Sequence, residues 1–353
     1  MFVRPPRTTA RSYQAAQLEE SRMEERMRTQ PRHECYLCGS AGETIYKGLT
    51  DRRGITRGTW GFLRCTSPIC GLVWLDPIPI EADIGMAYDG YYTHTSARVA
   101  DGSGLGSRTG LAQIAGMVLR RTRVYRPLAD EHDRRAWEYL DDIKPGRLLE
   151  VGCGNGSRLQ KMRDLGWDVV GQDVDPEAVA FARKSGLAVH LGPVATAAFR
   201  SESFNAILIA HVIEHVHDPI ALLQECRRVL HPGGRLVVFT PNFESYGHRR
   251  FRESWRELDP PRHLHLFTVT TLLAASIRAG LNPVGLWTTE ANAFSVCSGS
   301  ANQKRSDRNR IGSKPELLGA LLARGFQYWA SVEFIADPNS GEECVLVATP
   351  SMR

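Results

Sequence analysis

The chain has 353 residues, 42% of them hydrophobic, and a formal net charge of +5 at pH 7. This length supports one full-sized hydrophobic core with a small second module, and it excludes two large domains. No apolar run approaches the roughly 20 residues that cross a bilayer, and the first residues lack the apolar core of a signal peptide, so a cytoplasmic protein without membrane contact is expected.

Residues 1–32 are rich in Arg, Glu and Gln and contain few large apolar side chains. Such a composition predicts a disordered or frayed helical arm. Further basic residues cluster at 120–126, but a nucleic-acid surface would require a stronger field with interleaved aromatic side chains. A solvated basic face is therefore expected, and nucleic-acid binding is disfavoured.

Residues 33–80 are short, turn-rich and β-like. They contain four of the eight cysteines, arranged as a C-x2-C pair and a C-x4-C pair with a glycine after each: Cys35, Cys38, Cys65 and Cys70. Thiolates spaced in this way in tight turns supply four tetrahedral ligands for zinc. Because a closed four-thiolate site leaves no position for a catalytic water, the sequence predicts a structural module for folding or docking. Free thiols in a reducing compartment are the alternative.

Residues 81–129 are predicted to form a linker with helices. The aromatic run YDGYY leads into DGSGLGSRTG, whose Gly and Ser content is typical of linkers. The apolar spacing of LAQIAGMVL and then of AWEYL predicts helices that lead into the main domain.

The main domain, assigned to residues 130–350, alternates strands and helices. Strands are predicted at RLLEVG, DVVGQD, LAVHL, FNAILIA and RLVVFT, and helices are predicted to begin near Ser157, Pro176 and Pro219. This alternation indicates a parallel sheet with helices on both faces. Such sheets bind their ligands at the carboxyl ends of the strands.

The run LLEVGCGNGSRLQKM places a glycine-rich turn directly between a strand and a helix. Its glycines let the backbone approach a ligand closely, and they are Gly152, Gly154 and Gly156. A dinucleotide fold would present a similar pattern. Glu150, however, disfavours a pyrophosphate and suits a ligand that carries an ammonium and a sulfonium. Asp173 ends the next strand, at about the 20-residue separation at which an acid accepts hydrogen bonds from ribose hydroxyls.

A third polar group, AHVIEHVHDP, follows the FNAILIA strand. The spacing from His211 to His215 matches the H-x-x-E-H pattern of zinc peptidases, but that pattern requires a long helix, and this segment stops at Pro219. A neutral imidazole near pH 7 can instead take the proton of an acceptor hydroxyl. His215 is the first candidate for such a base, and Glu214 is expected either to orient it or to cap the local backbone. A purely structural role for His215 is the alternative.

Across residues 130–290 the chain resembles the class I S-adenosylmethionine (SAM)-dependent methyltransferases in the order and spacing of its motifs. The resemblance rests on three runs, LLEVGCGNGS, VVGQDVDPEAVAFAR and SFNAILIAHVIEHVHDPIALLQECRRVLHPGGRLVVFTPN. The later block PPRHLHLFTVTTLLAASIRAGL is similar to a branch related to ubiquinone-biosynthesis O-methyltransferases, whose members often carry a cysteine-rich module ahead of an aromatic YY segment. His263 and His265 in this block are second candidates for the base. The resemblance implies a Rossmann-like, seven-stranded α/β sheet whose last strand, ECVLVATP, is antiparallel to the rest.

The resemblance also implies where the cofactor binds. The SAM-binding residues that it implies are Glu150, Gly152, Cys153, Gly154, Gly156, Asp173, Val174 and His211. Glu150 would then lie near the amino-acid end of SAM, and Asp173 would hold the ribose. The chain departs from the family pattern at Gly192 and Pro193, where an acid usually contacts adenine, and at Asn205, where the fourth strand usually opens with Asp.

These features lead us to expect transfer of a methyl group from SAM to a small-molecule acceptor, with oxygen as the acceptor atom. The acceptor pocket is expected to draw its walls from residues 84–110, 241–267 and 290–335. Two alternatives stay open. One is a sugar C-methyltransferase, and the other is a non-catalytic module in which the zinc ribbon and basic arm grip a macromolecule while the SAM fold is vestigial.

Overall fold

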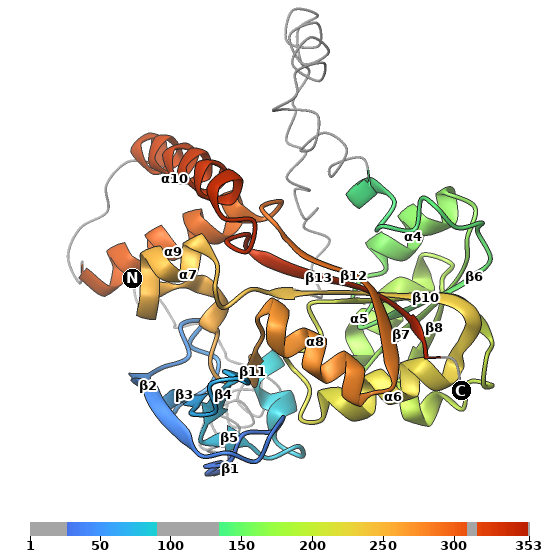
Figure 1. The fold of residues 1–353 in the computed structure, drawn as a ribbon, viewed down its shortest axis with the longest axis horizontal. Coiled ribbons are helices and arrows are strands. Elements are labelled where there is room, and N and C mark those ends of the chain that lie inside the picture. Colours follow the sequence, from blue (N-terminus) through green and yellow to red (C-terminus); the bar gives the residue numbers. More distant parts are fainter. Residues whose placement is uncertain (1–26, 90–133, 309–315, 352–353) are drawn as a thin grey trace, which may run out of the picture.

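Two sheets of four or more strands organise the molecule, one in the main domain and one around the cysteine module. The computed structural model describes residues 27–89, 134–308 and 316–351. It places the small sheet below one end of the large one (Figure 1). Within the described ranges no helix is long and apolar enough to cross a membrane.

The large sheet contains seven strands in the order β12-β13-β10-β9-β6-β7-β8. β13 is antiparallel to both of its neighbours, and the other neighbouring pairs are parallel. This order confirms the predicted Rossmann-like, seven-stranded sheet with an antiparallel last strand. The strands are β6 (Arg147–Val151), β7 (Asp168–Asp173), β8 (Ala188–Leu191), β9 (Phe204–Ala210), β10 (Leu230–Pro241), β12 (Leu281–Thr289) and β13 (Glu343–Pro350).

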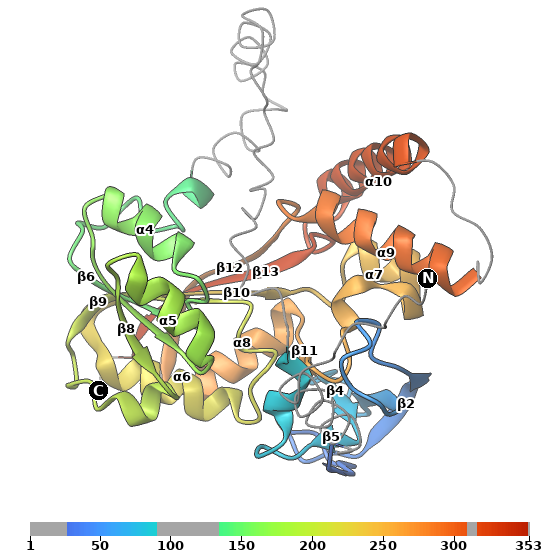
Figure 2. The same ribbon diagram turned by 180° about the vertical axis from the view of Figure 1, so that it is seen from behind.

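Helices cover both faces of this sheet, as the two opposite views show (Figures 1 and 2). α4 (Ser157–Asp164) and α5 (Pro176–Lys184) pack on one face, and α6 (Pro219–Val229) and α8 (Val269–Arg278) pack on the other. The first three begin at the predicted residues. α5 and α6 each start at a proline, and the aspartate before it caps the helix by accepting a backbone N–H. The strands between the helices are buried on both faces, which is why they appear as continuous apolar runs.

The cysteine module is built around a four-stranded antiparallel sheet in the order β11-β4-β3-β2. The module itself supplies β2 (Gly42–Leu49), β3 (Trp60–Cys65) and β4 (Val73–Asp76). The fourth strand, β11 (His265–Leu266), belongs to the main domain and pairs with β4. Backbone hydrogen bonds therefore join the module to the main domain in one sheet.

The segments predicted ahead of the main domain are only partly described. In the arm predicted for residues 1–32, β1 (Thr29–Gln30) pairs with β5 (Ile78–Pro79). LAQIAGMVL and most of the segment predicted as linker and helices lie outside the described residues. The helix predicted at AWEYL ends at residue 136, because Glu138 and Tyr139 adopt positive φ, which ends a helix.

Apart from η1 (Ile84–Tyr88) and η3 (Val194–Ala197), the other helices form a cap past the carboxyl end of β10, near the module (Figure 1). They pack on one another and on the segment that follows β10, so the cap is continuous with the edge of the sheet at which parallel strands bind ligands. The cap contains α7 (Tyr246–Phe251), η4 (Arg252–Ser254), η5 (Arg256–Leu258), α9 (Ala293–Arg308) and α10 (Glu316–Ala336).

Candidate functional site

A tight backbone turn joins β6 to α4. Gly152, Gly154 and Gly156 all have φ between +52° and +78°, a region that favours glycine. A Cβ on Gly152 or Gly156 would come within 2.3 Å of a packed side chain, whereas a Cβ on Gly154 would meet no atom within 4 Å. Cys153 is buried between them, and its N–H donates to the carbonyl of Gln172 in β7 at 3.0 Å. The outer glycines are therefore required by packing, and open space remains beside Gly154.

Asp173, at the end of β7, faces this turn. Its carboxylate accepts hydrogen bonds from the backbone N–H of Gly154 at 2.7 Å and of Asp175 at 2.9 Å. Burial raises the pKa of Asp173 despite these bonds. The side chain of Val174 beside it is 67% exposed, and Leu191 at the end of the neighbouring strand β8 is also exposed. A fixed carboxylate between exposed apolar side chains suits a ligand with hydroxyls and a flat apolar ring.

Glu150 lies buried in β6, two residues before the turn. Its Oε1 accepts a hydrogen bond from Arg158 at 2.9 Å, whereas Oε2 has no partner among the described residues. Burial raises the pKa of Glu150 to about 7, against the opposing effect of the Arg158 charge. Arg158 also lies 3.4 Å from Glu138, which pairs with Lys161 at 2.8 Å. A buried carboxylate oxygen without a partner favours the approach of a cationic group.

The predicted catalytic residues meet where β9 ends. One side-chain polar atom from each of Glu214, His215 and His263 lies within 4.8 Å of the others, and the two imidazole rings are 4.6 Å apart. His215 Nδ1 lies 3.0 Å from the carbonyl oxygen of Arg262 and 2.9 Å from the Tyr88 hydroxyl, and His263 Nδ1 lies 2.7 Å from the carbonyl oxygen of Glu257. Because a carbonyl oxygen can only accept, these contacts favour the tautomer of each neutral ring that has its proton on Nδ1 and its lone pair on Nε2.

Opposite protonation states lie side by side in this cluster. Burial would disfavour a charge on His211, but hydrogen bonds to Glu214 and Glu343 outweigh it and raise the pKa of His211 to about 10. Burial and the neighbouring His263 lower the pKa of His215 to about 4. Burial also opposes ionisation of Glu214, but the hydrogen bond from His211 holds its pKa at about 2. At neutral pH the cluster therefore holds an imidazolium, a carboxylate and a neutral imidazole.

Sequence reasoning missed Glu343 and Arg135 in this network. It also missed Tyr88, whose hydroxyl lies 2.9 Å from His215 Nδ1, and Thr240, which donates to Glu214 at 3.0 Å. Glu343 opens β13 and is fully buried, and it lies 2.8 Å from His211 Nε2 and 2.6 Å from the Arg135 guanidinium. An acid at the start of the otherwise apolar ECVLVATP strand is a signal that could have found Glu343. Arg135 lies ahead of β6 in a segment without a recognisable pattern.

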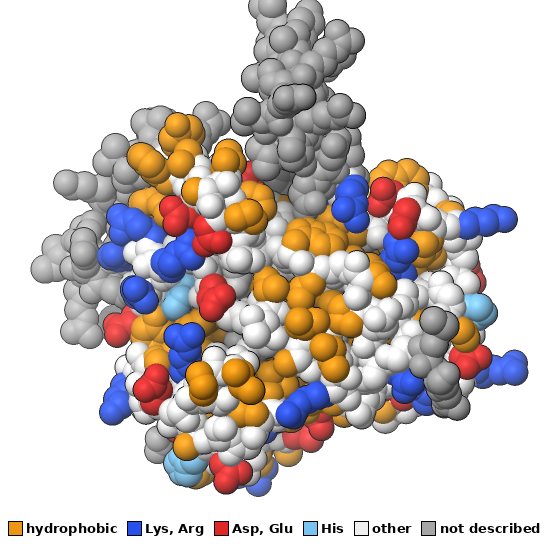
Figure 3. All heavy atoms as spheres, in the orientation of Figure 1, with side chains coloured by type: hydrophobic (Ala, Val, Ile, Leu, Met, Phe, Trp, Pro, Cys, Tyr) orange, Lys and Arg blue, Asp and Glu red, His pale blue; other side chains and the backbone are white. Residues whose placement is uncertain are grey.

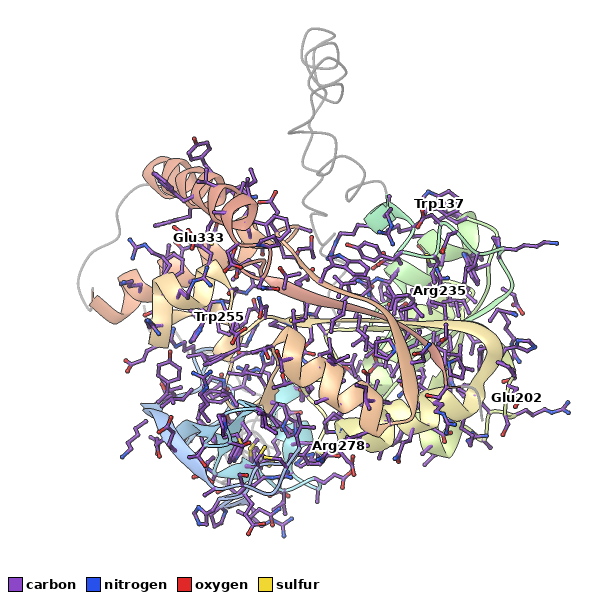
Figure 4. The ribbon with its side chains drawn as sticks, viewed as in Figure 1. Trp137, Glu202, Arg235, Trp255, Arg278 and Glu333 are labelled. Carbon is purple, nitrogen blue, oxygen red and sulfur yellow. The ribbon has the colours of Figure 1, made fainter. Side chains whose placement is uncertain are left out.

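His265, the other second candidate, does not join the cluster. It lies fully buried in β11, and its ring packs on Tyr36 of the cysteine module, with the ring centres 5.3 Å apart. Of the aromatic side chains in the predicted walls of the acceptor pocket, Phe243, Trp255 and Phe267 are largely buried. Trp255 lies between α7 and the module (Figure 4). Neighbours in the sequence PPRHLHLF thus point to different parts of the molecule.

The four cysteines of the module converge, and Figure 4 shows sulfur atoms gathered there. Cys35 Sγ lies 3.6 Å from Cys70 Sγ, Cys38 Sγ lies 3.3 Å from Cys65 Sγ, and all four sulfurs lie within 4.8 Å of one another. A tetrahedral zinc ion bound at about 2.3 Å sets its sulfur ligands about 3.8 Å apart. The sulfur positions therefore fit the ion, and the two extra residues of the C-x4-C pair are absorbed in the turn closed by the bond from Cys70 N–H to the Ser67 carbonyl.

Comparison with known proteins places this geometry in context. A family model described as a methyltransferase domain matches residues 120–286. A ubiquinone biosynthesis O-methyltransferase of Cereibacter sphaeroides is 35% identical over 150 residues, which cover 39% of this chain and 61% of that protein's length. The same enzyme from another strain is 31% identical over 183 residues, which cover 45% of this chain and 74% of that protein. A solved SAM-dependent methyltransferase structure from Archaeoglobus fulgidus has 18% identity and a TM-score of 0.42, covering 67% of this chain and 99% of that chain.

Proposed function

The chain belongs to the SAM-dependent methyltransferase family, and on that premise we propose that it transfers the methyl group of SAM to an oxygen atom of a small-molecule acceptor. The observation that carries this proposal is the contact between the glycine turn and the segment that bears the catalytic candidates. Gly152 packs so closely on Val212 that a Cβ would lie 2.3 Å from its side chain. Val212 stands between His211 and Glu214, so a ligand on the turn lies next to the cluster.

The residues around the turn fit SAM group by group. We assign the ribose hydroxyls to Asp173, the adenine to the space beside the exposed side chains of Val174 and Leu191, and the ammonium to the free Oε2 of Glu150. The backbone around Gly154 has room for the ligand to approach. When bound, SAM supplies a methyl group that is already activated on a sulfonium.

The chain itself contributes by orienting the acceptor oxygen and by accepting the proton that the acceptor hydroxyl loses. We assign Nε2 of His215 as the atom that accepts this proton, with His263 beside it as the second candidate, because the backbone carbonyl at Nδ1 of each ring favours a lone pair on Nε2. Glu214 is ionised and buried next to them, so it would stabilise the imidazolium that forms. His211 is already protonated at neutral pH and is therefore assigned to positioning Glu214.

We further propose that Cys35, Cys38, Cys65 and Cys70 hold a structural zinc ion. The proposal is supported by the convergence of their sulfur atoms and by the absence of a disulfide bond at any of the four. Binding at such a site contributes directly to the folding free energy of the small module around it.

The proposed function is tested by calorimetric titration of the purified full chain with SAM, followed by incubation with hydroxylated small molecules and detection of the demethylated cofactor. We expect SAM to bind in about the micromolar range. Nuclear magnetic resonance of the product then separates a methyl group on oxygen from one on carbon, which is the outcome expected of a sugar C-methyltransferase. A folded chain that does not bind SAM contradicts the proposal. A chain that binds SAM but turns over no acceptor supports the non-catalytic alternative.

A further inference from the structure

A cavity of about 540 Å³ lies between the cysteine module and the helical cap. The module lines it with Tyr46 of β2 and Arg64 of β3, and the cap lines it with Phe243, residues 251–254 and Lys304 of α9. None of these residues is assigned above to SAM, to proton transfer or to zinc. A cavity of this size where two structural units meet is a common location for a ligand.

The lining of this cavity is strongly basic. Three cationic side chains, Arg64, Arg252 and Lys304, reach it from three separate elements, and the lining contains one acid, Glu253. Three positive charges less one negative charge give the lining a formal charge of +2. Within the part of the chain that the structure describes, none of the three cations forms an ion pair. Basic side chains also gather on the outer surface over α7 and α9 (Figure 3).

Packing holds the wall of the cavity in place. The ring of His248 stacks on Phe243, with centroids 3.9 Å apart, and its Nε2 lies 2.8 Å from the Tyr46 hydroxyl. Burial lowers the pKa of His248 to about 4, so this ring is neutral and adds no charge to the lining. Arg252 has a φ of +52°, a strained conformation for a residue with a side chain and one that recurs at ligand-binding sites.

The cavity lies on the side of the sheet at which the cofactor and acceptor are expected. Phe243 follows the end of β10 by two residues, and β10 is hydrogen-bonded to β9, which leads into His211. In parallel sheets of this kind ligands bind beyond the carboxyl ends of the strands. A ligand in the cavity therefore lies on the same side of the sheet as the catalytic candidates. The ring of Trp255 supports the cavity wall, with its centre 6.3 Å from that of Phe243 and 5.1 Å from that of His248.

We propose that this cavity binds a phosphate or diphosphate group carried by the methyl acceptor, an inference that rests on the proposed function. Arginine forks and a lysine ammonium match the oxygens of phosphates, with which they form strong, charge-assisted hydrogen bonds. A carboxylate carries a single charge and would leave the lining, with its formal charge of +2, with one positive charge uncompensated.

The test is calorimetric titration of the full chain, saturated with SAM, with inorganic pyrophosphate, inorganic phosphate and acetate. The Arg64→Ala/Lys304→Ala variant removes two of the three cations. Arg200→Ala removes an exposed arginine shortly before β9, at the opposite edge of the sheet, and serves as the matched control. We expect pyrophosphate to bind the wild-type chain and the control equally. In the double variant its dissociation constant should rise about ten-fold or more, while SAM affinity is unchanged.

The other possible results each contradict one of the two proposals. If pyrophosphate binds the double variant as tightly as the wild type, or if acetate binds as tightly as pyrophosphate, the phosphate assignment is overturned. Lys304→Glu, at the partly buried α9 position that lines the cavity, replaces the double variant if the latter does not fold, and the same loss of pyrophosphate affinity is expected. If SAM binds but pyrophosphate does not, the cavity assignment fails and the proposed function stands. If SAM itself does not bind, the proposed function fails.

Discussion

The two sides of the candidate site hold their polar groups in different ways. On the cofactor side, Asp173 is fixed by two backbone N–H groups and has the exposed side chain of Val174 beside it. On the acceptor side, a cationic His211, an anionic Glu214 and a neutral His215 are packed together. The first arrangement offers fixed acceptors to a ligand. The acceptor-side arrangement keeps a cation, an anion and a neutral imidazole within a few residues of one another, as is typical of groups that accept or donate protons in catalysis. Substitutions on the two sides should therefore affect different measurements.

The largest effect is expected for His215→Ala. This variant should lower the methyl-transfer rate by ~10²-fold or more, because a positioned base contributes about that factor to the rate. SAM affinity should stay near that of the wild type, since His215 is assigned to the acceptor. Single-turnover methyl transfer and SAM titration on the same preparation measure both quantities. His231→Ala, at an exposed histidine near the start of β10, is the matched control.

The pH profile sharpens this expectation. A base must be neutral to accept a proton, and burial keeps the pKa of His215 at about 4. The rate of the wild type should therefore be flat from about pH 5 upward and fall only as the pH drops toward 4. A rate limb near the ordinary histidine pKa would instead assign the proton to a less buried group. Loss of the folded state in His215→Ala would support the structural role.

Asp173→Ala is expected to produce the opposite pattern. Loss of the carboxylate should weaken SAM binding by about ten- to a hundred-fold, or ~1.5 to 3 kcal/mol. At saturating SAM the rate should recover. Calorimetric titration measures the affinity, and Asp168→Ala, at the exposed start of the same strand, is the control. Unchanged SAM affinity in a folded Asp173→Ala chain would rule out the ribose assignment.

Substitutions in the cysteine module should change zinc content without changing the measurements that report on the cofactor side or the acceptor side of the site. Metal analysis of fresh protein should find about one zinc per chain, and Cys38→Ser should lose it, because the exposed Cys38 thiolate supplies one of four ligands. SAM affinity should change little. Cys226→Ala, at a buried cysteine of α6 outside the cluster, should keep its zinc. Full zinc retention in Cys38→Ser would argue against the four-thiolate site.

The smallest effect concerns His211 and folding stability. Its pKa in the folded chain is about 10, above the value of about 6.5 expected when unfolded. Its contribution to stability is therefore fully present below about pH 6.5 and is lost as the pH rises through about 10. Since the side chain is partly exposed, we expect at most about 1 kcal/mol. Thermal unfolding of wild type and His211→Asn from neutral to alkaline pH should show the difference shrinking. A constant difference would contradict the assignment.

The cofactor side of the site could be predicted from the sequence because neighbouring residues build it. The apolar run of β6, the three glycines and the start of α4 are consecutive, and Asp173 follows at the end of the next strand. The starts of α5 and α6 were equally predictable, because an Asp-Pro pair determines the cap within two residues. Local patterns of this kind require no knowledge of how distant segments pack.

The acceptor side could be predicted only in part because distant segments build it. Glu343 contacts His211 only because β13 pairs antiparallel with β10 in the folded sheet. No local sequence pattern predicts a contact between these two positions. The same limit separates His263 from His265. Their spacing in the loop does not predict that the His263 ring lies against His215 while the His265 ring lies against the cysteine module.

The pairing of β11 with β4 has a consequence for synthesis of the chain. The module is made first, but the edge of β4 stays open until His265 and Leu266, about 190 residues later, have been added. At roughly 5–20 residues per second this takes about 10–40 s. During that interval a strand edge carrying Trp74 is available to other chains, which favours aggregation. A nascent chain stalled before residue 265 should therefore recruit chaperones more strongly than one stalled after α8.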